Sequence, residues 1–482
     1  MPARRGELAN MPTHPNLILF MPETVRADAV FGPEGKCAFT PHLDALITEG
    51  GAFPYTFSQS PFCAPSRCCL ATGQYPHTGG YRAFSHLVQP HEWNAFRELR
   101  EAGYYTVAFG KNDMLAQGAV PLSFDEVDLR VKPEDYGQYT DRRQEPKHRY
   151  SFYQGKREGP CHDTDWACIE SALQFLDETH DRPFCLFLPL AFAHPTYVVE
   201  EPYYSLHDRA SLPPPLPYRP EDKRRYVCHL HESHGLGELM EDDLREIRAV
   251  YYGMISRVDA QLGQIVSRLR ERGLYENTAL FYFSDHGDYT GDYGLTEKWN
   301  AAFEDAMLRV PLACRIPGFP ATGVHNGLVE IIDLYATIMD VAGIQPRHPH
   351  FGCSLMPALR GEEFTGRDAV FAEAGLREDE NGRHLPPIPD DSIYALRRDL
   401  VLNVPGINTR AAMARTERYK YVYCPGDRDE LYDLRTDPGE LMNRADDPAL
   451  SAVRVVMKER LLRWLLETSD LLPYESDSRG WR

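Results

Sequence analysis

Residues 242–285 read DDLREIRAVYYGMISRVDAQLGQIVSRLRERGLYENTALFYFSD, a long helical pattern that ends at a glycine and is followed by an apolar run. The pattern predicts a helix that stops at Gly273 and then a buried strand over 278–283. Polar residues, SDHGD at 284–288, stand where this strand ends. A helix leading into a buried strand is the repeating unit of a parallel α/β sheet.

The same unit recurs on the N-terminal side. Residues 94–111, NAFRELREAGYYTVAFGK, predict a helix and a strand, and residues 165–192 predict another such pair. The run 16–21, NLILFM, predicts a buried strand, and residues 40–51 predict a helix with Pro41 in its first turn. These repeats predict an α/β fold with a large, mostly parallel central sheet that is sandwiched by helices.

The C-terminal part has a different pattern. Residues 412–438 predict short antiparallel strands with tight turns, and residues 448–472 predict an amphipathic helix. We therefore expect two domains: a larger α/β domain over 1–366 and a smaller α+β domain over 367–482, with an antiparallel sheet and a helix.

Polar side chains follow several of the predicted strands. They lie at 22–24 (PET), 110–113 (GKND), 193–195 (AHP) and 284–288 (SDHGD), and the cysteine-containing segment 60–73 follows the strand-like run 52–58. In open α/β sheets, ligands bind beyond the carboxyl ends of the strands. Five such segments at one edge predict a functional site there.

Cys63 lies in the segment SPFCAPSRCCLATG, at the predicted start of a short helix. Three interpretations compete. It is a cysteine that packs in the core, or a thiolate nucleophile that Arg67 and the helix N-terminus would activate, or a cysteine that is covalently modified. The nucleophile would also need a histidine base, and none is adjacent in the sequence.

Composition excludes some function classes. The chain has 482 residues, with 52 Lys and Arg against 71 Asp and Glu, which gives a formal charge of −19. This balance argues against nucleic acid or an anionic membrane as a partner. The eleven cysteines are scattered without C-x-x-C spacing, and we find neither a signal peptide nor an apolar run of membrane-spanning length. We therefore expect reduced thiols and a cytoplasmic location.

Two long stretches rich in polar residues and proline, 197–235 and 375–410, interrupt the pattern. They are either functional lids or variable insertions. The second stretch also offers an interface for a homo-oligomer.

The run Cys63-Ala64-Pro65-Ser66-Arg67, with Leu70, Thr72 and Gly73 behind it, resembles the signature of the type I sulfatases of the alkaline phosphatase superfamily. Further similarity, in the same order along the chain, lies at 14–28, 103–111, 251–288, 297–312 and 415–445. The resemblance implies that a formylglycine-generating enzyme oxidises Cys63 to formylglycine. It also implies that a divalent cation and basic side chains offset the charge of the sulfate.

The resemblance also implies the roles of individual residues. Glu23, Thr24, Asp285 and His286 fall at the family's metal-binding positions, together with Cys63, and oxygen-rich ligands favour Ca²⁺. Arg67 would hold the formylglycine, Lys111 and Lys298 would bind sulfate oxygens, and His194 is the candidate general acid.

Two positions depart from the family pattern. Thr24 replaces the second of two consecutive aspartates, so it either coordinates through its hydroxyl or leaves a weaker or altered metal site. Asp113 replaces a histidine that acts as a base; it could act as that base or could pair with Lys111.

The leading hypothesis is therefore a sulfatase that hydrolyses a sulfate monoester, either a small sulfated carbohydrate or an aryl sulfate. The alternative in the same superfamily is a phosphonate monoester or phosphodiester hydrolase. A non-enzymatic alternative is a pseudo-enzyme that binds anions, which the loss of an aspartate at Thr24 would favour.

Overall fold

The computed structural model describes residues 14–31, 37–133, 150–159, 161–380, 387–472 and 474. A seven-stranded sheet in the order β11-β2-β10-β8-β1-β6-β4 runs through the larger part. Its strands are β1 (Asn16–Met21), β2 (Gly51–Ala52), β4 (Tyr105–Ala108), β6 (Phe184–Pro189), β8 (Thr278–Phe283), β10 (Leu312–Arg315) and β11 (Gly323–Val324). Strands β4, β6, β1 and β8 are parallel, whereas β10 is antiparallel to β8 and β2. The predicted large, mostly parallel sheet is confirmed.

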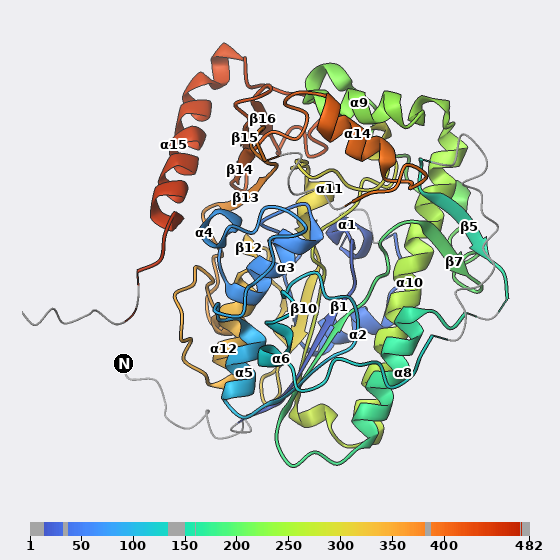
Figure 1. Cartoon of the computed structure of the whole chain (residues 1–482), viewed down its shortest axis with the longest axis vertical. Helices are drawn as coiled ribbons and strands as arrows, with labels where there is room; N and C mark the ends of the chain where they lie inside the picture. The colour runs from blue at the N-terminus through green and yellow to red at the C-terminus, as the bar shows by residue number, and fades with distance from the viewer. Residues whose placement is uncertain are drawn as a thin grey trace, which may run out of the picture.

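Helices cover both faces of this sheet, as β1 illustrates. Ile18 and Phe20 pack in one apolar core, while Leu17, Leu19 and Met21 pack in another. Because successive strand residues point to opposite faces, these are the cores on the two sides of the sheet. One side holds α2 (Pro41–Glu49), α8 (Thr164–Asp177) and α10 (Glu241–Glu271), and the other holds α3 (Cys63–Thr72), α5 (Ala95–Glu101) and α12 (Asp333–Ala342) (Figure 1).

The C-terminal part contains a four-stranded antiparallel sheet, as predicted. Its strands are β13 (Val370–Ala374), β14 (Ala411–Arg415), β15 (Tyr419–Tyr423) and β16 (Glu430–Asp433). Helix α15 (Ser451–Thr468) packs on β14 and β15, and its Trp464 stacks on Phe371 with ring centroids 5.0 Å apart (Figure 1). The boundary between residues 366 and 367 stays a prediction.

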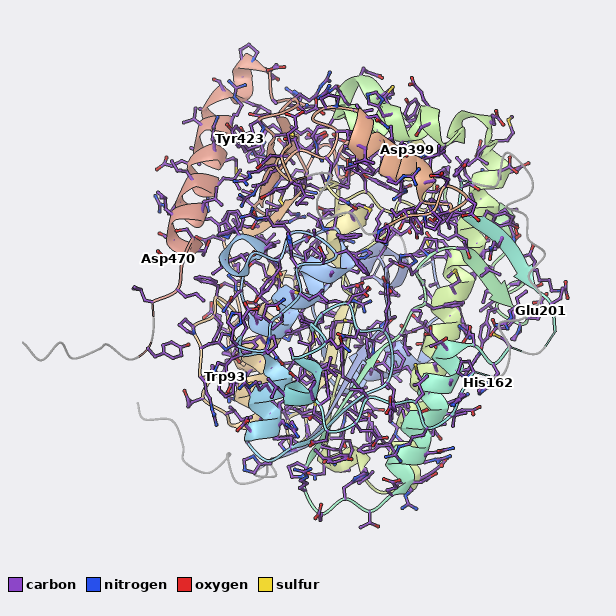
Figure 2. The ribbon with its side chains drawn as sticks, in the orientation of Figure 1. Trp93, His162, Glu201, Asp399, Tyr423 and Asp470 are labelled. Atoms are coloured by element: carbon purple, nitrogen blue, oxygen red, sulfur yellow. The ribbon has the colours of Figure 1, made fainter. Side chains whose placement is uncertain are left out.

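The two long stretches contain secondary structure, which the sequence analysis did not predict there. The first contains β7 (Tyr197–Glu200) and α9 (Arg225–Ser233), and the second contains α14 (Ala395–Asn403). Prolines precede both helices, at 213–220 for α9 and at 387 and 389 for α14. Residues 381–386 of the second stretch lie outside the described residues. Figure 2 shows α14, marked by Asp399, beside α9, and the two helices are in contact.

The strand expected over 52–58 is also interrupted. It is divided between β2 in the large sheet and β3 (Thr56–Phe57), which pairs with β9 (Arg309–Val310) and β12 (Val329–Glu330). The remaining elements are β5 (Tyr153–Arg157), α1 (Ala27–Val30), α4 (Pro76–Gly79), α6 (Val120–Ser123), α11 (Asp305–Leu308) and α13 (Met356–Leu359). No helix in the described part of the chain is both long and apolar enough to cross a membrane.

Candidate active site

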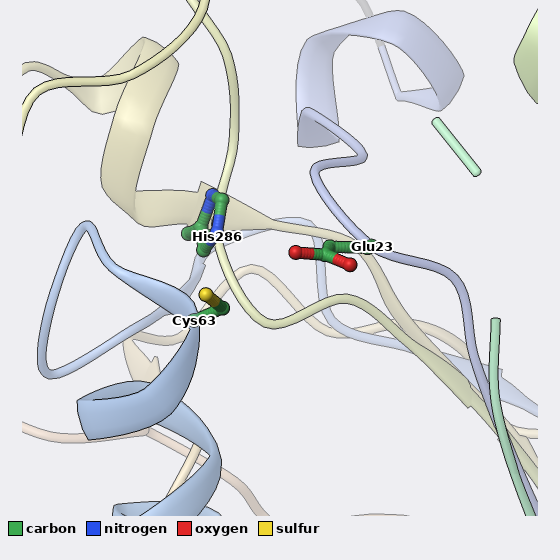
Figure 3. A group of neighbouring side chains, drawn as sticks. All are labelled: Glu23, Cys63 and His286. Carbon is green, nitrogen blue, oxygen red and sulfur yellow. The ribbon is translucent and has the colours of Figure 1, made fainter. Parts of the chain in front are cut away.

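The predicted convergence of strand ends is present. Strands β1, β6, β4 and β8 are parallel neighbours, and their carboxyl ends therefore lie at one edge of the sheet. These strands are followed by Glu23, His194, Lys111 and Asp285, respectively. Cys63 is the first residue of α3 and reaches the same place. Figure 3 shows Glu23, Cys63 and His286 facing one another from three separate segments.

Three of these side chains lie close enough to share a metal ion. The candidate ligand atoms of Glu23, Cys63 and His286 lie within 4.8 Å of one another, and all three residues are buried. The Nδ1 atom of His286 lies 2.9 Å from the carbonyl oxygen of Gly287. Its buried Nε2 has no hydrogen-bond partner among the described residues. A ring fixed through Nδ1 presents its Nε2 lone pair, as metal-binding histidines do.

Asp285 and Thr24 lie beside this group. The Asp285 Oδ1 atom accepts hydrogen bonds from the backbone amides of Thr24 (3.2 Å) and His286 (2.9 Å). Thr24 has φ = 58°, a left-handed conformation that is unusual for a β-branched residue. Its buried Oγ1 lacks a hydrogen-bond partner within the described residues. Such strain and an unsatisfied hydroxyl are typical of functional sites.

The Arg67 guanidinium lies between the two carboxylates. Its Nε atom is 2.8 Å from Asp285 Oδ2, and its Nη2 atom is 3.2 Å from Glu23 Oε2. Burial favours the neutral carboxyl of Asp285, but His286 and Arg67 hold its pKa below the ordinary value. Glu23 is also fully buried, and Arg67 is the strongest of the cations that keep its pKa well below the usual range. Both carboxylates are therefore ionised at neutral pH.

Lys111 lies on the open side of Glu23. Its Nζ atom is 2.9 Å from Glu23 Oε1 and 2.8 Å from Asp113 Oδ2. Of the two interpretations of Asp113, the pairing with Lys111 is therefore present in the structure. Lys111 and Cys63 line the same cavity, so the Lys111–Asp113 pair lies at the edge of that cavity.

His194 and Lys298 form the other side of the site. The Lys298 Nζ atom is 2.6 Å from His194 Nε2 and 2.8 Å from Glu297 Oε1. Burial, together with the charge of Lys298, lowers the pKa of His194 to about 4. At neutral pH the ring is therefore uncharged and accepts a hydrogen bond from the lysine.

Cys63 itself is 2% exposed, and burial raises the pKa of its thiol to about 12. The thiolate would be a minor species at physiological pH, so the geometry does not favour direct cysteine nucleophilic catalysis. Cys63, Lys111, His194 and Lys298 line one cavity with a volume of about 490 Å³. A substrate in this cavity would meet all four side chains.

The sulfatase family model matches residues 15–344, which is more than half of the chain. The chain belongs to the sulfatase family. This confirms the resemblance drawn from the motifs and classes the protein as a sulfuric ester hydrolase.

Relatives of the sulfatase family match over nearly all of the chain. A choline-sulfatase of Rhizobium meliloti (strain 1021) is 26% identical over 97% of this chain and 90% of its own length. Arylsulfatase K of Bos taurus is 26% identical over 92% of this chain and 80% of its own length. The multifunctional alkaline phosphatase superfamily protein PehA of Trinickia caryophylli is 26% identical over 97% of this chain and 99% of its own length.

A phosphonate monoester hydrolase of Agrobacterium radiobacter has a similar solved structure. The TM-score is 0.77 at 24% sequence identity, with coverage of 97% of this chain and 99% of that one. At this identity the likeness shows the shared fold alone, and it confirms the predicted fold class.

The sequence analysis missed two residues of this candidate site. Glu297 binds Lys298, and Arg397 of α14 contacts both the Glu297 carboxylate and the carbonyl oxygen of Lys298. The backbone amide of Glu297 also donates to the hydroxyl of Tyr197 (2.8 Å). The position of Glu297 beside Lys298 was a usable signal, but nothing local pointed to Arg397, which lies a hundred residues further along the chain.

Proposed function

We propose that the protein hydrolyses a sulfate monoester in the cavity above Cys63, after Cys63 has been oxidised to formylglycine. The observation that carries this proposal is the convergence of Cys63 with two ionised carboxylates, His286 and three cationic side chains at one sheet edge. Sulfate oxygens are negative and repel a nucleophile, so a site of this kind must supply positive charge before attack is feasible.

A divalent cation fits the donor set of Glu23, Asp285, His286 and Thr24. The support is chemical: two buried carboxylates, an unpartnered imidazole nitrogen and an unpartnered hydroxyl within the described site. We propose calcium, because most of these donors are oxygen atoms. When bound, the cation would polarise the sulfate and the formylglycine oxygen.

Formylglycine also fits position 63. The thiol is poorly ionised there, and the side chain faces the cation-binding residues from the first turn of α3. When hydrated, the aldehyde would supply two hydroxyls, one to attack sulfur and one to release sulfate afterwards. Because Cys63 is buried in the folded chain, we expect a formylglycine-generating enzyme to act before folding is complete.

The surrounding side chains would bind the ester and move its protons. Lys111 and Lys298 would hold sulfate oxygens, and Arg67 would hold residue 63 and the two metal-binding carboxylates. His194 is our candidate general acid: the negative charge of a bound sulfate would raise its depressed pKa and favour protonation at Nε2. That proton would go to the oxygen of the departing alcohol.

Replacing Asp113 with asparagine is expected to lower kcat by about 100-fold while KM changes less than about threefold, as for a lost general base. Steady-state kinetics on a sulfate ester would measure both values. An unchanged kcat would remove Asp113 from the reaction, and a lower KM with normal kcat would mean that it only restrains Lys111.

Replacing Arg397 with alanine is expected to raise KM about tenfold, because the Glu297 carboxylate would then face the sulfate site without its outer cation. The double variant Arg397→Ala with Glu297→Gln should have a KM close to that of Glu297→Gln alone. Arg397→Lys should keep most of the binding. If Arg397 only packs α14 in place, Glu297→Gln will not rescue the loss.

The alternative is a phosphonate monoester or phosphodiester hydrolase with the same machinery, and a phosphonate monoester hydrolase of Agrobacterium radiobacter shares this fold. Turnover of an aryl sulfate and of an aryl phosphodiester, measured side by side, distinguishes the two activities. A reducing, cytoplasmic environment stays our proposal, from the scattered spacing of the eleven cysteines. A homo-oligomer through residues 375–410 stays a prediction.

The decisive test is the mass of the peptide that contains Cys63, from protein co-expressed with a formylglycine-generating enzyme, measured together with sulfate release. We expect the mass of the aldehyde or its hydrate, and activity in proportion to the modified fraction. Full activity with an unmodified thiol would overturn the proposal. A modified but inactive protein would favour the anion-binding pseudo-enzyme, which activity restored by Thr24→Asp would support.

A further inference from the structure

The cavity above Cys63 has a charged floor and apolar walls. Phe62 and Phe84 line one side, and Leu376, Ile388, Pro389 and Val401 of the C-terminal part line it as well. Cavities of this size that are lined mainly by apolar side chains bind apolar groups. The sulfate would therefore lie on the floor and the alcohol part of the ester would lie among these side chains.

The charged groups in the walls are largely committed to one another. Glu297 is paired with Lys298 and Arg397, and Arg398 is paired with Asp390 and donates to the carbonyl oxygen of Ile388. Hydroxyl groups of a sugar need hydrogen-bond partners once they leave water, and unpaired ones weaken binding. Four uncharged polar residues, Ser60, Asn300, Ser392 and Asn408, also line the cavity. Sugar hydroxyls that face the apolar side chains would still lack partners, so these walls match a sugar poorly.

A cationic alcohol also fits poorly. The residues that line the cavity include the cations Arg82, Lys111, Lys298, Arg397 and Arg398, and Glu297 is the one carboxylate among the lining residues described. That carboxylate is already shared by Lys298 and Arg397. A positive group on the alcohol would therefore lose its hydration without gaining an unpaired carboxylate among the lining residues described.

Phe84 belongs to the apolar wall and is also partly exposed to solvent. It is 40% exposed although it is a large aromatic residue, and its ring centroid lies 6.2 Å from that of Phe62. The Phe62 ring in turn lies under the Lys298 ammonium, 5.9 Å from the Nζ atom. An apolar group against these rings would cover exposed aromatic surface directly beside the lysine that binds sulfate.

We propose that the substrate is the sulfate ester of an apolar, uncharged alcohol, and that Phe84 and Ile388 are determinants of this specificity. The inference rests on the proposed sulfatase activity and narrows its substrate class. Of the substrate classes that the sequence left open, it favours the ester of an apolar alcohol and excludes the sulfated sugar.

The test compares esters with the same kind of leaving group. Ethyl, butyl and hexyl sulfate, glucose 6-sulfate and choline sulfate are all esters of primary alcohols. The three alkyl esters have nearly equal intrinsic reactivity, and the ammonium group makes choline the better leaving group, which works against the order we expect. We expect kcat/KM to rise about two- to fourfold for each added methylene, since burying one is worth up to ~0.8 kcal/mol. Hexyl sulfate should exceed both glucose 6-sulfate and choline sulfate by about 100-fold. A flat alkyl series, or a preference for either polar ester, would overturn the proposal.

Phe84→Ala should flatten the series, with a loss of about tenfold on hexyl sulfate and little change on ethyl sulfate, because only the longer chain reaches the ring. Phe39→Ala is the matched control, since Phe39 is 56% exposed and is not among the residues that line the cavity. An equal loss on both esters would contradict the assignment of Phe84.

Calorimetric binding to a Cys63→Ala variant separates this inference from the proposed function. Tighter binding of hexyl sulfate than of glucose 6-sulfate would support the apolar cavity even if no ester is hydrolysed, in which case only the proposed function fails. Hydrolysis with a preference for glucose 6-sulfate would leave the proposed function intact and overturn the substrate class.

Discussion

Cys63→Ser is expected to lower the rate of repeated turnover by about 10⁴-fold or more, as loss of a nucleophile does in other hydrolases. A serine hydroxyl can attack sulfur once, but it lacks the second hydroxyl that releases sulfate from residue 63. The protein should therefore stop after one turnover with a stable sulfate ester on serine. Rapid-mix measurement of the released alcohol, followed by intact mass, would detect both features.

The matched control for this variant is Cys68→Ser. Cys68 is buried in the same helix, and its Sγ atom contacts the carbonyl oxygen of Met114 at 3.3 Å. Serine can keep this hydrogen bond, so we expect turnover within about twofold of the parent protein. Repeated turnover by Cys63→Ser at the parent rate would show that residue 63 is not the nucleophile.

Arg67→Met is expected to lower the free energy of unfolding by about 3–5 kcal/mol, because it leaves buried carboxylates without their cation. Arg67 is 1% exposed and contacts both Glu23 and Asp285. Activity should also be lost, since the same guanidinium holds the groups that would bind the metal and residue 63. Denaturant unfolding and kinetics on the folded protein would measure the two effects separately.

Arg257→Met supplies the control for stability. Arg257 is equally buried and pairs with Asp163 and Glu200, outside the residues that line the cavity. It should destabilise the fold by a similar amount and leave the activity of the folded fraction nearly unchanged. Equal activity in both variants would show that Arg67 takes no part in the reaction.

Calcium should also raise the unfolding temperature of Arg67→Met more than that of the parent, because the ion would replace part of the lost positive charge.

Much of the site could be predicted because several of its residues directly follow a predicted strand in the sequence. Glu23 follows β1, Lys111 follows β4 and Asp285 follows β8, and parallel pairing brings these ends together whatever the loops do. Side-chain pairing was harder to predict. The sequence left the pairing of Lys111 with Asp113 as one of two alternatives and did not predict its contact with Glu23, because both depend on which oxygens lie within reach of a flexible side chain.

The sequence by itself determined the α/β architecture, the strand-end segments and the Cys63 motif, because these follow from periodicity and from residues adjacent in the chain. Only the tertiary structure decided how the cavity is closed. The contact between Arg397 and Glu297 exists because α14 packs over the sheet edge beside α9. The apolar wall likewise joins Phe84 to Ile388, residues far apart in the chain that no local pattern relates. Long-range packing, rather than local propensity, therefore sets the chemistry that the substrate meets.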